Sequence, residues 1–431
     1  MLGPEGLDAT VTLESGAAGT PLWWAIVKGL ECELTYQEEI RQEEGKGEGA
    51  GGPQLAMAKF LVEKGAAVDV AGIDKYGNVS TPLWLAIEAV RHGKEGGLEL
   101  AKLLVEKVND VDAVGIYKVG NESTTLTPLL FAASAYRSCF GQAGLQLAKL
   151  LVEKGAAVDA VVKSESGAEC TALWLAARAV HCGIEGGLEL AKLLLKKGAD
   201  VDSVGKSGDG FERTPLWSFS LNPTQHGIEC TPLWLAARTL HDGNEGGLEL
   251  TKLLLKQGAD VDAVGKTGDG VECTPLWLAA KALHLGNEGG LERAKVLLKN
   301  GANANAIGKH RYAIGKSGDG VECTPLWLAA KAVYHDHEGG LELTKLLLEK
   351  VEDVNAVGQY LHGKEYTPLS VAAQAVKNGK EHGATLVRIL VSAGARLMDA
   401  EKVRWQGIID DVMEIPANLR ELSADHAEHQ N

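Results

Sequence analysis

The sequence repeats itself along most of its length, and this repetition constrains the fold more than any other feature. The stretch from Val271 to Gly301 reads VECTPLWLAAKALHLGNEGGLERAKVLLKNG, and related copies of it recur in the same order through the chain. One threonine marks each copy, at Thr20, Thr81, Thr127, Thr171, Thr231, Thr274, Thr324 and Thr367. A unit this short cannot bury its apolar residues alone, so the units are predicted to stack on their neighbours.

Each unit is predicted to open with a helix. The Thr274 hydroxyl can accept a hydrogen bond from a free N–H group at the helix start, and Pro275 suits the first helical position. The apolar positions that follow are Leu276, Ala279, Ala280 and Leu283. Their spacing places them on one helix face, where the small alanines allow a neighbouring helix to approach closely.

A second helix is predicted after the polar run GNEGG, from Leu291 to Lys299. Its apolar positions are Leu291, Ala294, Leu297 and Leu298. Gly301 follows as a left-handed cap. A connector rich in glycine and aspartate, such as GADVDAVGKTGDGVE from Gly258 to Glu272, then leads to the next unit with extended character.

These motifs resemble those of the ankyrin repeat family. TPLWLAA is similar to the family's TPLHxAA, LELAKLLLKKGADVD is similar to its second helix and exit turn, and the connector stands in the place of its β-hairpin. The resemblance covers roughly residues 20–397. It implies an all-α fold, an ankyrin-type α-solenoid of stacked helix-turn-helix repeats with hairpin-like connectors.

The chain departs from the family pattern in two ways. Its unit is about 43 residues long, as from Thr231 to Thr274, whereas the family's unit has about 33. The histidine of TPLH is a tryptophan in most copies, so the hydrogen-bonding role of that histidine is not carried over.

Three segments are predicted: an N-terminal segment at 1–19, an array of about eight units at 20–397, and a C-terminal cap and disordered tail at 398–431. Within the array, the charged run from Tyr36 to Gly52 is predicted to be a loop between helices. A second TPLW at Thr214 is interpreted as an incomplete copy inserted in a connector. The cap is predicted as a helix from Glu401 to Met413. Its apolar side is Trp405, Ile408, Ile409, Val412 and Met413.

Composition narrows the function classes. The net charge of −15 and pI near 5.3 argue against general binding to nucleic acid or anionic membranes, which both need a basic surface. No stretch has the form of a secretory leader or a membrane span. We therefore expect a soluble monomer in the cytoplasm, with the nucleus left open.

Motifs that suggest cofactors fail on spacing. The connectors contain GKS or GKT, at Lys206-Ser207, Lys266-Thr267 and Lys316-Ser317. A phosphate-binding loop has four residues between its first glycine and GK, whereas six separate Gly258 from Gly265. The calcium-loop pattern that begins at Asp260 has Val264 at a ligand position. We expect no cofactor, no metal and no catalytic residue.

Seven cysteines, an odd number, do not predict a disulfide framework. Four of them precede the threonine cap, at Cys170, Cys230, Cys273 and Cys323. Apolar packing against the first helix is favoured over metal or redox chemistry. The pair His335 and His337 is only a weak metal motif.

Five tryptophans share one position of the first helix, at Trp84, Trp174, Trp234, Trp277 and Trp327. They form either a buried ladder between units or an exposed platform for a ligand. Packing is favoured, because large aromatic side chains contribute most when they are buried.

Basic and aromatic residues follow four of these tryptophans, Trp174, Trp234, Trp277 and Trp327, by four and seven positions. They are Arg178, His181, Arg238, His241, Lys281, His284, Lys331 and Tyr334, and we call them the basic stripe. Their spacing places each pair on the same side of the helix as its tryptophan. The family resemblance implies that this stripe is exposed and faces a partner, flanked by Asp209, Asp269, Asp319, Glu272 and Glu322. A solvated face without a partner is the alternative.

The repeated surface predicts a non-catalytic scaffold or adaptor that binds a protein partner in the groove of the array. The basic stripe favours a partner segment with carboxylates or phosphates. The alternative is recognition of a phosphorylated small ligand or a nucleic acid by the tryptophan, arginine and histidine side chains.

Overall fold

A computed structural model describes residues 7–31, 52–119, 122–134, 141–163, 169–206, 228–238, 245–267, 270–287, 289–311, 320–360 and 364–414. The predicted loop after Tyr36 (apart from Gly52), the incomplete copy at Thr214 and the predicted disordered tail lie outside these residues. The chain divides into two compact units, each made of several of the sequence repeats: Met1–Leu235 and Ala236–Asn431. From here on, "unit" means one of these two parts and "repeat" means one sequence copy. The division falls within helix α10, Pro232–Ala237.

The helices of the first unit are α1 (Pro21–Glu31), α3 (Gly52–Glu63), α4 (Pro82–Arg91), α5 (Gly97–Lys107), α6 (Pro128–Ser134), α7 (Gly141–Glu153), α8 (Ala172–His181) and α9 (Gly187–Lys196). Its strands are β1 (Val11–Thr12), β2 (Ala18–Gly19), β3 (Gly72–Ile73), β4 (Val79–Ser80), β5 (Gly115–Val119), β6 (Glu122–Leu126), β7 (Val162–Lys163), β8 (Glu169–Cys170), β9 (Gly205–Lys206) and β10 (Glu229–Cys230).

The helices of the second unit are α11 (Glu245–Lys256), α12 (Pro275–His284), α13 (Gly289–Lys299), α14 (Pro325–Tyr334), α15 (Gly340–Leu348), α16 (Pro368–Lys377), α17 (Gly383–Ser392) and α18 (Asp399–Glu414). Its strands are β11 (Gly265–Lys266), β12 (Glu272–Cys273), β13 (Gly308–Arg311), β14 (Gly320–Cys323), β15 (Gly358–Tyr360) and β16 (Lys364–Tyr366).

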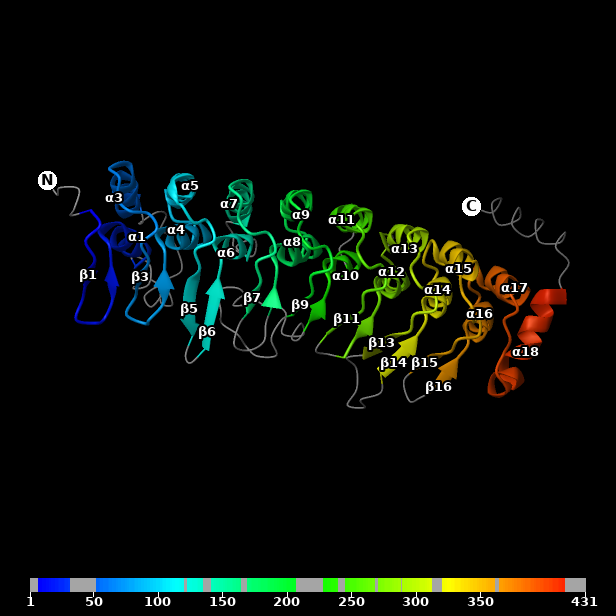
Figure 1. The fold of residues 1–431 in the computed structure, drawn as a ribbon. Coiled ribbons are helices and arrows are strands. Elements are labelled where there is room, and N and C mark those ends of the chain that lie inside the picture. Colours follow the sequence, from blue (N-terminus) through cyan, green and yellow to red (C-terminus); the bar gives the residue numbers. More distant parts are fainter. Residues whose placement is uncertain are drawn as a thin grey trace, which may run out of the picture. The chain divides into compact units, whose positions relative to one another are not determined.

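Each unit stacks helix pairs in two rows. In the first unit, the first helices α1, α4, α6 and α8 pack in sequence, and so do the second helices α3, α5, α7 and α9 (Figure 1). In the second unit, α12, α14 and α16 form the row of first helices, and α11, α13 and α15 pack in the row of second helices. Within each unit, most helices therefore contact their pair partner and the equivalent helix of the next repeat, as the repeated sequence predicts.

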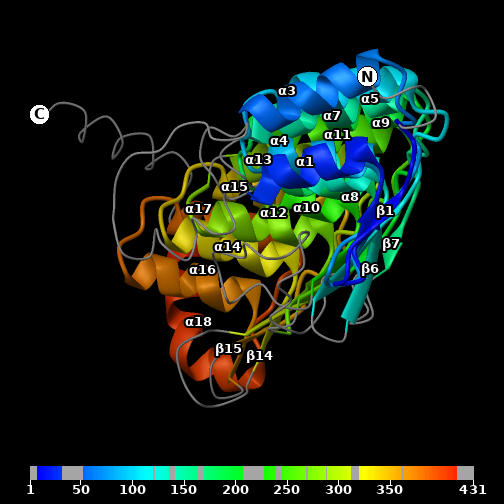
Figure 2. The same cartoon turned by 90° about the vertical axis from the view of Figure 1, so that its left-hand side faces the viewer.

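The connectors are β-hairpins that pair with one another. In the first unit β1 to β6 form one antiparallel sheet, and β7, β8, β9 and β10 pair in that order. In the second unit β11 to β14 pair in order and β15 pairs with β16. Figure 2 shows strands of the first unit, β1, β6 and β7 among them, along one side of its helices.

The predicted cap of the first helix is confirmed. The Thr274 side chain accepts a hydrogen bond from the Trp277 N–H at 3.4 Å, with Pro275 at the first helical position. The same bond recurs at Thr81, Thr171, Thr324 and Thr367. The predicted apolar face of this helix is buried as well, at Leu276, Ala279, Ala280 and Leu283.

The second helix begins where a glycine lets two helices touch. A Cβ atom at Gly290 would lie 2.6 Å from the Leu283 backbone nitrogen and 2.7 Å from the Ala279 carbonyl oxygen. Real Cβ atoms do not approach backbone so closely, so only glycine fits there. Gly290 is thus the packing point of α13 on the end of α12.

One prediction for α13 is wrong. Leu291 is half-buried, whereas Arg293 is 2 % exposed and fills the core position that Leu190 and Leu343 fill in α9 and α15. The other predicted core residues, Ala294, Leu297 and Leu298, are buried.

The predicted C-terminal helix is α18, which packs on α16 and α17. Trp405, Ile409 and Val412 are buried, as expected of a cap. Met413 is 46 % exposed, so its predicted place on the buried face is wrong, and Ile408 is only half-buried. In the part of the chain that is described, no helix is both long and apolar enough to span a membrane.

Candidate functional site

The shared tryptophans are buried, so the packing alternative for them is confirmed. Trp84, Trp174, Trp234, Trp277 and Trp327 are each at most 2 % exposed. Two of them bond to the following repeat: the Nε1–H of Trp174 donates to the Cys230 carbonyl at 3.0 Å, and that of Trp277 to the Cys323 carbonyl at 2.9 Å. The indoles of Trp174 and Trp277 therefore fasten one repeat to the next, and burial leaves none of the five with a face open for stacking a base.

The four cysteines before the caps are buried free thiols. The carbonyl groups of Cys230 and Cys323 are the acceptors described above. Burial raises the pKa of the Cys170 and Cys323 thiols to about 12. A thiol with so high a pKa is almost entirely protonated at neutral pH and is a poor nucleophile. This agrees with the packing role predicted for them.

The basic stripe lies on the tryptophans, as the spacing predicts. The Arg178 guanidinium carbon is 5.3 Å from the centre of the Trp174 ring. The ammonium groups of Lys281 and Lys331 lie 5.2 and 5.4 Å from the rings of Trp277 and Trp327. These distances are within the range of a cation–π interaction.

The expectation that the whole stripe is exposed is wrong. Arg178 is 5 % exposed and Lys331 is 8 % exposed, because their side chains lie along the indole. The remaining described members, His181, Arg238, Lys281, His284 and Tyr334, are half-buried. His241 lies outside the described residues. Over the described residues, the stripe is therefore buried or half-buried rather than exposed.

Other repeats carry different residues at the position of Arg178, namely Glu88 in α4, Ser134 in α6 and Gln374 in α16. Burial raises the pKa of Glu88 to about 7, against the opposing effect of Arg91. Arg91 in turn lies over the ring of Phe131 in the next repeat, 5.5 Å from its centre. The stripe is thus basic in only part of the array.

The expected acidic flank is partly engaged within the hairpins. Glu272 pairs with Lys266 at 3.1 Å, and Glu322 pairs with Lys309 at 3.0 Å. The three aspartates named with them, Asp209, Asp269 and Asp319, lie outside the described residues. The two glutamates therefore balance lysines of their own hairpins.

Three histidines meet at the ends of α12 and α14. The ring centres of His284 and His335 are 5.2 Å apart, and those of His335 and His337 are 5.9 Å apart. We call His284, His335 and His337 the histidine cluster. Of the three, the spacing of the sequence placed only His284 in a binding surface.

Burial and neighbouring charges lower the pKa values of His284 and His335 in this cluster. Burial, with the neighbouring His335 and Lys331 next in effect, lowers the pKa of His284 to about 3. Burial also lowers the pKa of Lys331 to about 8, and burial with Lys331 lowers that of His335. At neutral pH the imidazole of His284 is therefore neutral, and its Nδ1 finds no hydrogen-bond partner among the described residues.

Asp336 is unusual in this surface. It has a φ of 58°, the one positive value at a non-glycine among the described residues, where the equivalent residues of other repeats are Gly93, Gly183, Gly286 and Gly379. Its carboxylate pairs with Lys380 of the next repeat at 2.7 Å. Comparison of the copies with one another could have revealed this residue before the structure.

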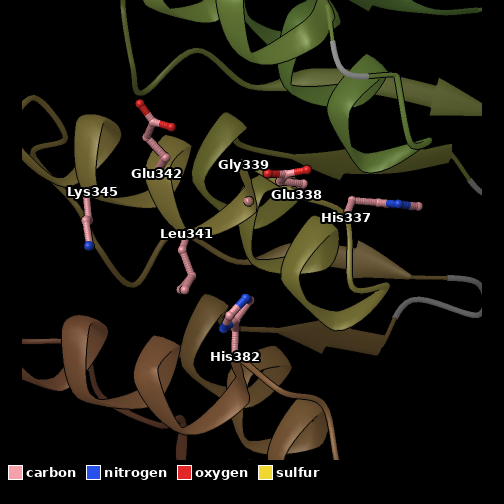
Figure 3. Close-up of a pocket in the computed structure, with 8 residues that line it drawn as sticks. His337, Glu338, Gly339, Leu341, Glu342, Lys345 and His382 are labelled. Carbon is pink, nitrogen blue, oxygen red and sulfur yellow. The ribbon is translucent and has the colours of Figure 1, made fainter. Parts of the chain in front are cut away.

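An open cavity of about 370 Å³ lies between α15 and the start of α17 (Figure 3). It is lined by His337, Glu338, Gly339, Gly340, Leu341, Glu342, Lys345 and His382. Its acidic and basic side chains are mixed, so it carries no clear preference for one charge. Within the described part of the chain, no group of three histidine, cysteine or acidic side chains is arranged to hold a metal ion.

The family model for the ankyrin repeat matches this chain at four places, residues 169–206, 229–266, 272–309 and 322–359. Each match runs from the strand before the first helix to the strand after the second. With the capped helix pairs and paired hairpins described above, these matches show that the chain is an ankyrin repeat protein.

Three solved ankyrin repeat structures are similar to this chain. The ankyrin repeat protein EF0377 is 20 % identical over 62 % of this chain and 97 % of its own, with a TM-score of 0.35. The Legionella pneumophila effector AnkC is 14 % identical over 92 % and 96 %, with a TM-score of 0.34. An ankyrin repeat protein from Leishmania major is 16 % identical over 77 % and 97 %, with a TM-score of 0.34. No curated protein sequence matches significantly.

Proposed function

We propose that this protein is a non-catalytic scaffold or adaptor of the cytoplasm that binds a protein partner along its first helices. Ankyrin repeats are generally modules for protein–protein interaction. The observation that carries the proposal is the fixed display of side chains at the ends of α12 and α14. Leu285 is 60 % exposed there and His335 is exposed, while the residues beneath them are buried.

This surface has the composition of a binding site. A large apolar side chain, two aromatic rings and several cations lie together on rigid helices, so little side-chain entropy is lost on binding. Tyr334 is held by Asn378, whose amide donates to the phenol oxygen at 2.9 Å. Beneath this surface, the lysines of the basic stripe are held in place against the indole rings of Trp277 and Trp327.

The second candidate, recognition of a phosphorylated small ligand or nucleic acid by the tryptophans, is less well supported. Stacking needs an exposed aromatic face, and the five shared tryptophans are buried. A thermal-shift panel of nucleotides and oligonucleotides at two salt concentrations tests it, because a nucleic-acid site would stabilise the protein less at high salt.

The scaffold proposal is tested by affinity capture from lysate, comparing the wild type with a Leu285→Glu, His335→Glu variant. Both positions are exposed, so the variant is expected to fold, and an unchanged melting temperature checks this. Lys299→Glu on the exposed end of α13 is the matched control. Partners lost with the double variant and kept with the control support the proposal. Partners kept with both would contradict it.

A further inference from the structure

The histidine cluster joins two repeats of the second unit. His284 ends α12, whereas His335 and His337 follow α14. The loop after α12 also contributes, because a Cβ atom at Gly286 would lie 3.1 Å from the His337 ring. The three imidazoles therefore share one small patch rather than three separate positions.

The charged groups that act on His284 and His335 are mostly cationic, whereas Glu338 and Glu342 line the cavity beside His337. Lys281 and Lys331 approach it from α12 and α14, and Lys380 approaches it from the end of α16. The one carboxylate whose charge acts on His335 is Asp336, and Lys380 already pairs with it. Every charge found to act on His284 is a cation or an ionisable imidazole. The patch thus collects positive charge that Asp336 offsets only in part.

Lys331 is held in place rather than free to swing toward solvent. Its ammonium lies 5.4 Å from the centre of the Trp327 ring and 4.8 Å from that of Tyr334. Tyr334 packs edge-on against His335, with 5.0 Å between ring centres. The cation is fixed beneath an exposed imidazole, an arrangement that favours an anion at the surface above it.

The surface next to the patch is apolar. Leu285 follows His284 directly and is 60 % exposed. A free inorganic ion would make no use of this leucine, whereas a peptide that carries an anionic residue beside an apolar one would contact both. A phosphate monoester suits the anionic part, because its three acceptor oxygens can reach several donors at once.

We propose that the histidine cluster and Leu285 bind a phosphorylated segment of a protein partner. The phosphoryl oxygens accept hydrogen bonds from His335 and His337 over the charge of Lys331, and an apolar residue beside the phosphate packs on Leu285. This inference rests on the proposed function, since it names the kind of partner that the same surface takes.

Binding is also linked to protons. A dianion above the cluster favours the protonated imidazoles, because opposite charges stabilise each other. The bound protein therefore takes up protons at neutral pH. Burial and Lys331 lower the pKa of His335 in the free protein, so the complex holds a proton there that the free protein lacks, and affinity is expected to fall as the pH rises above neutral.

The test uses the full chain with ¹³C-labelled histidine and three peptides, Ac-Gly-Xaa-Leu-Gly-NH₂ with Xaa phosphoserine, glutamate or serine. We expect the phosphopeptide to shift the His335 and His337 signals and to raise the pKa of His335. The glutamate and serine peptides and inorganic phosphate should each bind about tenfold more weakly or worse, as expected for loss of a charge-assisted hydrogen bond. If the glutamate peptide bound equally well, the site would recognise any carboxylate rather than a phosphate. If inorganic phosphate bound equally well, the peptide would contribute nothing to binding. Either result overturns the proposal.

Variants identify the site. His335→Asn with His337→Asn should weaken the phosphopeptide by about tenfold or more, and His181→Asn in the first unit is the matched control. If the double variant does not fold, the neutral substitution Leu285→Ser replaces it and should weaken the phosphopeptide but not inorganic phosphate. Wild-type affinity in these variants overturns the proposal. The two proposals can fail separately. If the phosphopeptide does not bind but capture of partners from lysate still depends on Leu285, only this inference is wrong. If the phosphopeptide binds but capture does not depend on Leu285 and His335, the scaffold function is wrong instead.

Discussion

Gly308 lies so close to Trp277 that a Cβ atom on the glycine would overlap the indole ring. Trp277 belongs to the first helix of a repeat and Gly308 opens the strand that leaves the same repeat. The same relationship pairs Trp23 with Gly72, Trp84 with Gly115, Trp174 with Gly205 and Trp327 with Gly358. Each of these buried tryptophans therefore needs a glycine in its own outgoing hairpin.

Substitution of Gly308 by alanine should destabilise the second unit by about 1–3 kcal/mol, the usual cost of overpacking a core. The added methyl has no space unless the Trp277 ring moves, and movement would strain the bond of its Nε1–H to the Cys323 carbonyl. Urea unfolding followed by tryptophan fluorescence measures the change.

Gly407→Ala is the control for this experiment. Gly407 lies inside α18, and a Cβ atom there would meet nothing within 4 Å. Alanine should stabilise the helix at this position by up to about 1 kcal/mol. Equal effects of the two substitutions would show that the Trp277 contact does not restrict Gly308.

A buried arginine in α13 should cost the protein stability. Arg293 occupies a core position that is leucine in α9 and α15, and no carboxylate of the described residues pairs with it. Its hydrogen bond to the Asn287 side chain is 3.5 Å long, and burial lowers its pKa. Arg293→Leu is therefore expected to stabilise the second unit by about 1–4 kcal/mol, as other buried charges do when replaced by apolar residues.

Thermal unfolding of Arg293→Leu beside Lys299→Leu measures this gain. Lys299 is exposed on the same helix, so its substitution should change stability by less than about 0.5 kcal/mol. A melting temperature of Arg293→Leu at or below that of the wild type would mean that the arginine is satisfied by a partner within the core.

Sequence alone was enough to predict the stacked helix pairs, the threonine caps and the burial of the tryptophans, because these follow from local spacing and composition. It was not enough to predict the covering of Arg178 and Lys331. Whether a cation points to solvent or lies along its own indole depends on how the next repeat packs, which spacing does not encode. Arg293 and Asp336 differ from their equivalents in other copies, so alignment of the chain with itself could have indicated both.

Acid should destabilise the second unit through His284. The pKa of this group is about 3 in the folded chain, whereas that of a free histidine side chain is 6.5, so between these values the unfolded chain holds the extra proton. Stability is then lost as the pH falls below 6.5. For His284 alone, the free energy of unfolding is expected to fall by about 1.4 kcal/mol between about pH 7.5 and 5.5.

Urea unfolding at both pH values, in the wild type and in His284→Gln, isolates this contribution from that of the carboxylates. The loss of stability on acidification should be smaller in the variant by about 1.4 kcal/mol. An identical loss in both proteins would show that His284 is not held neutral.

Raising the pH above neutral should stabilise the second unit through Lys331. Burial lowers the pKa of this lysine from 10.5 to about 8, so between these values the unfolded chain binds a proton that the folded chain lacks. Its contribution to stability therefore increases as the pH rises through this window, by about 2 kcal/mol from about pH 7.5 to 9.5. The buried cysteines oppose this effect, because thiols such as Cys170 ionise more readily once the chain is unfolded.

Lys331→Met keeps an unbranched chain over the Trp327 ring and leaves the cysteines unchanged. The stability of the wild type relative to this variant, measured by urea unfolding at both pH values, should thus increase as the pH rises, and a constant difference would mean that Lys331 stays charged above its buried indole.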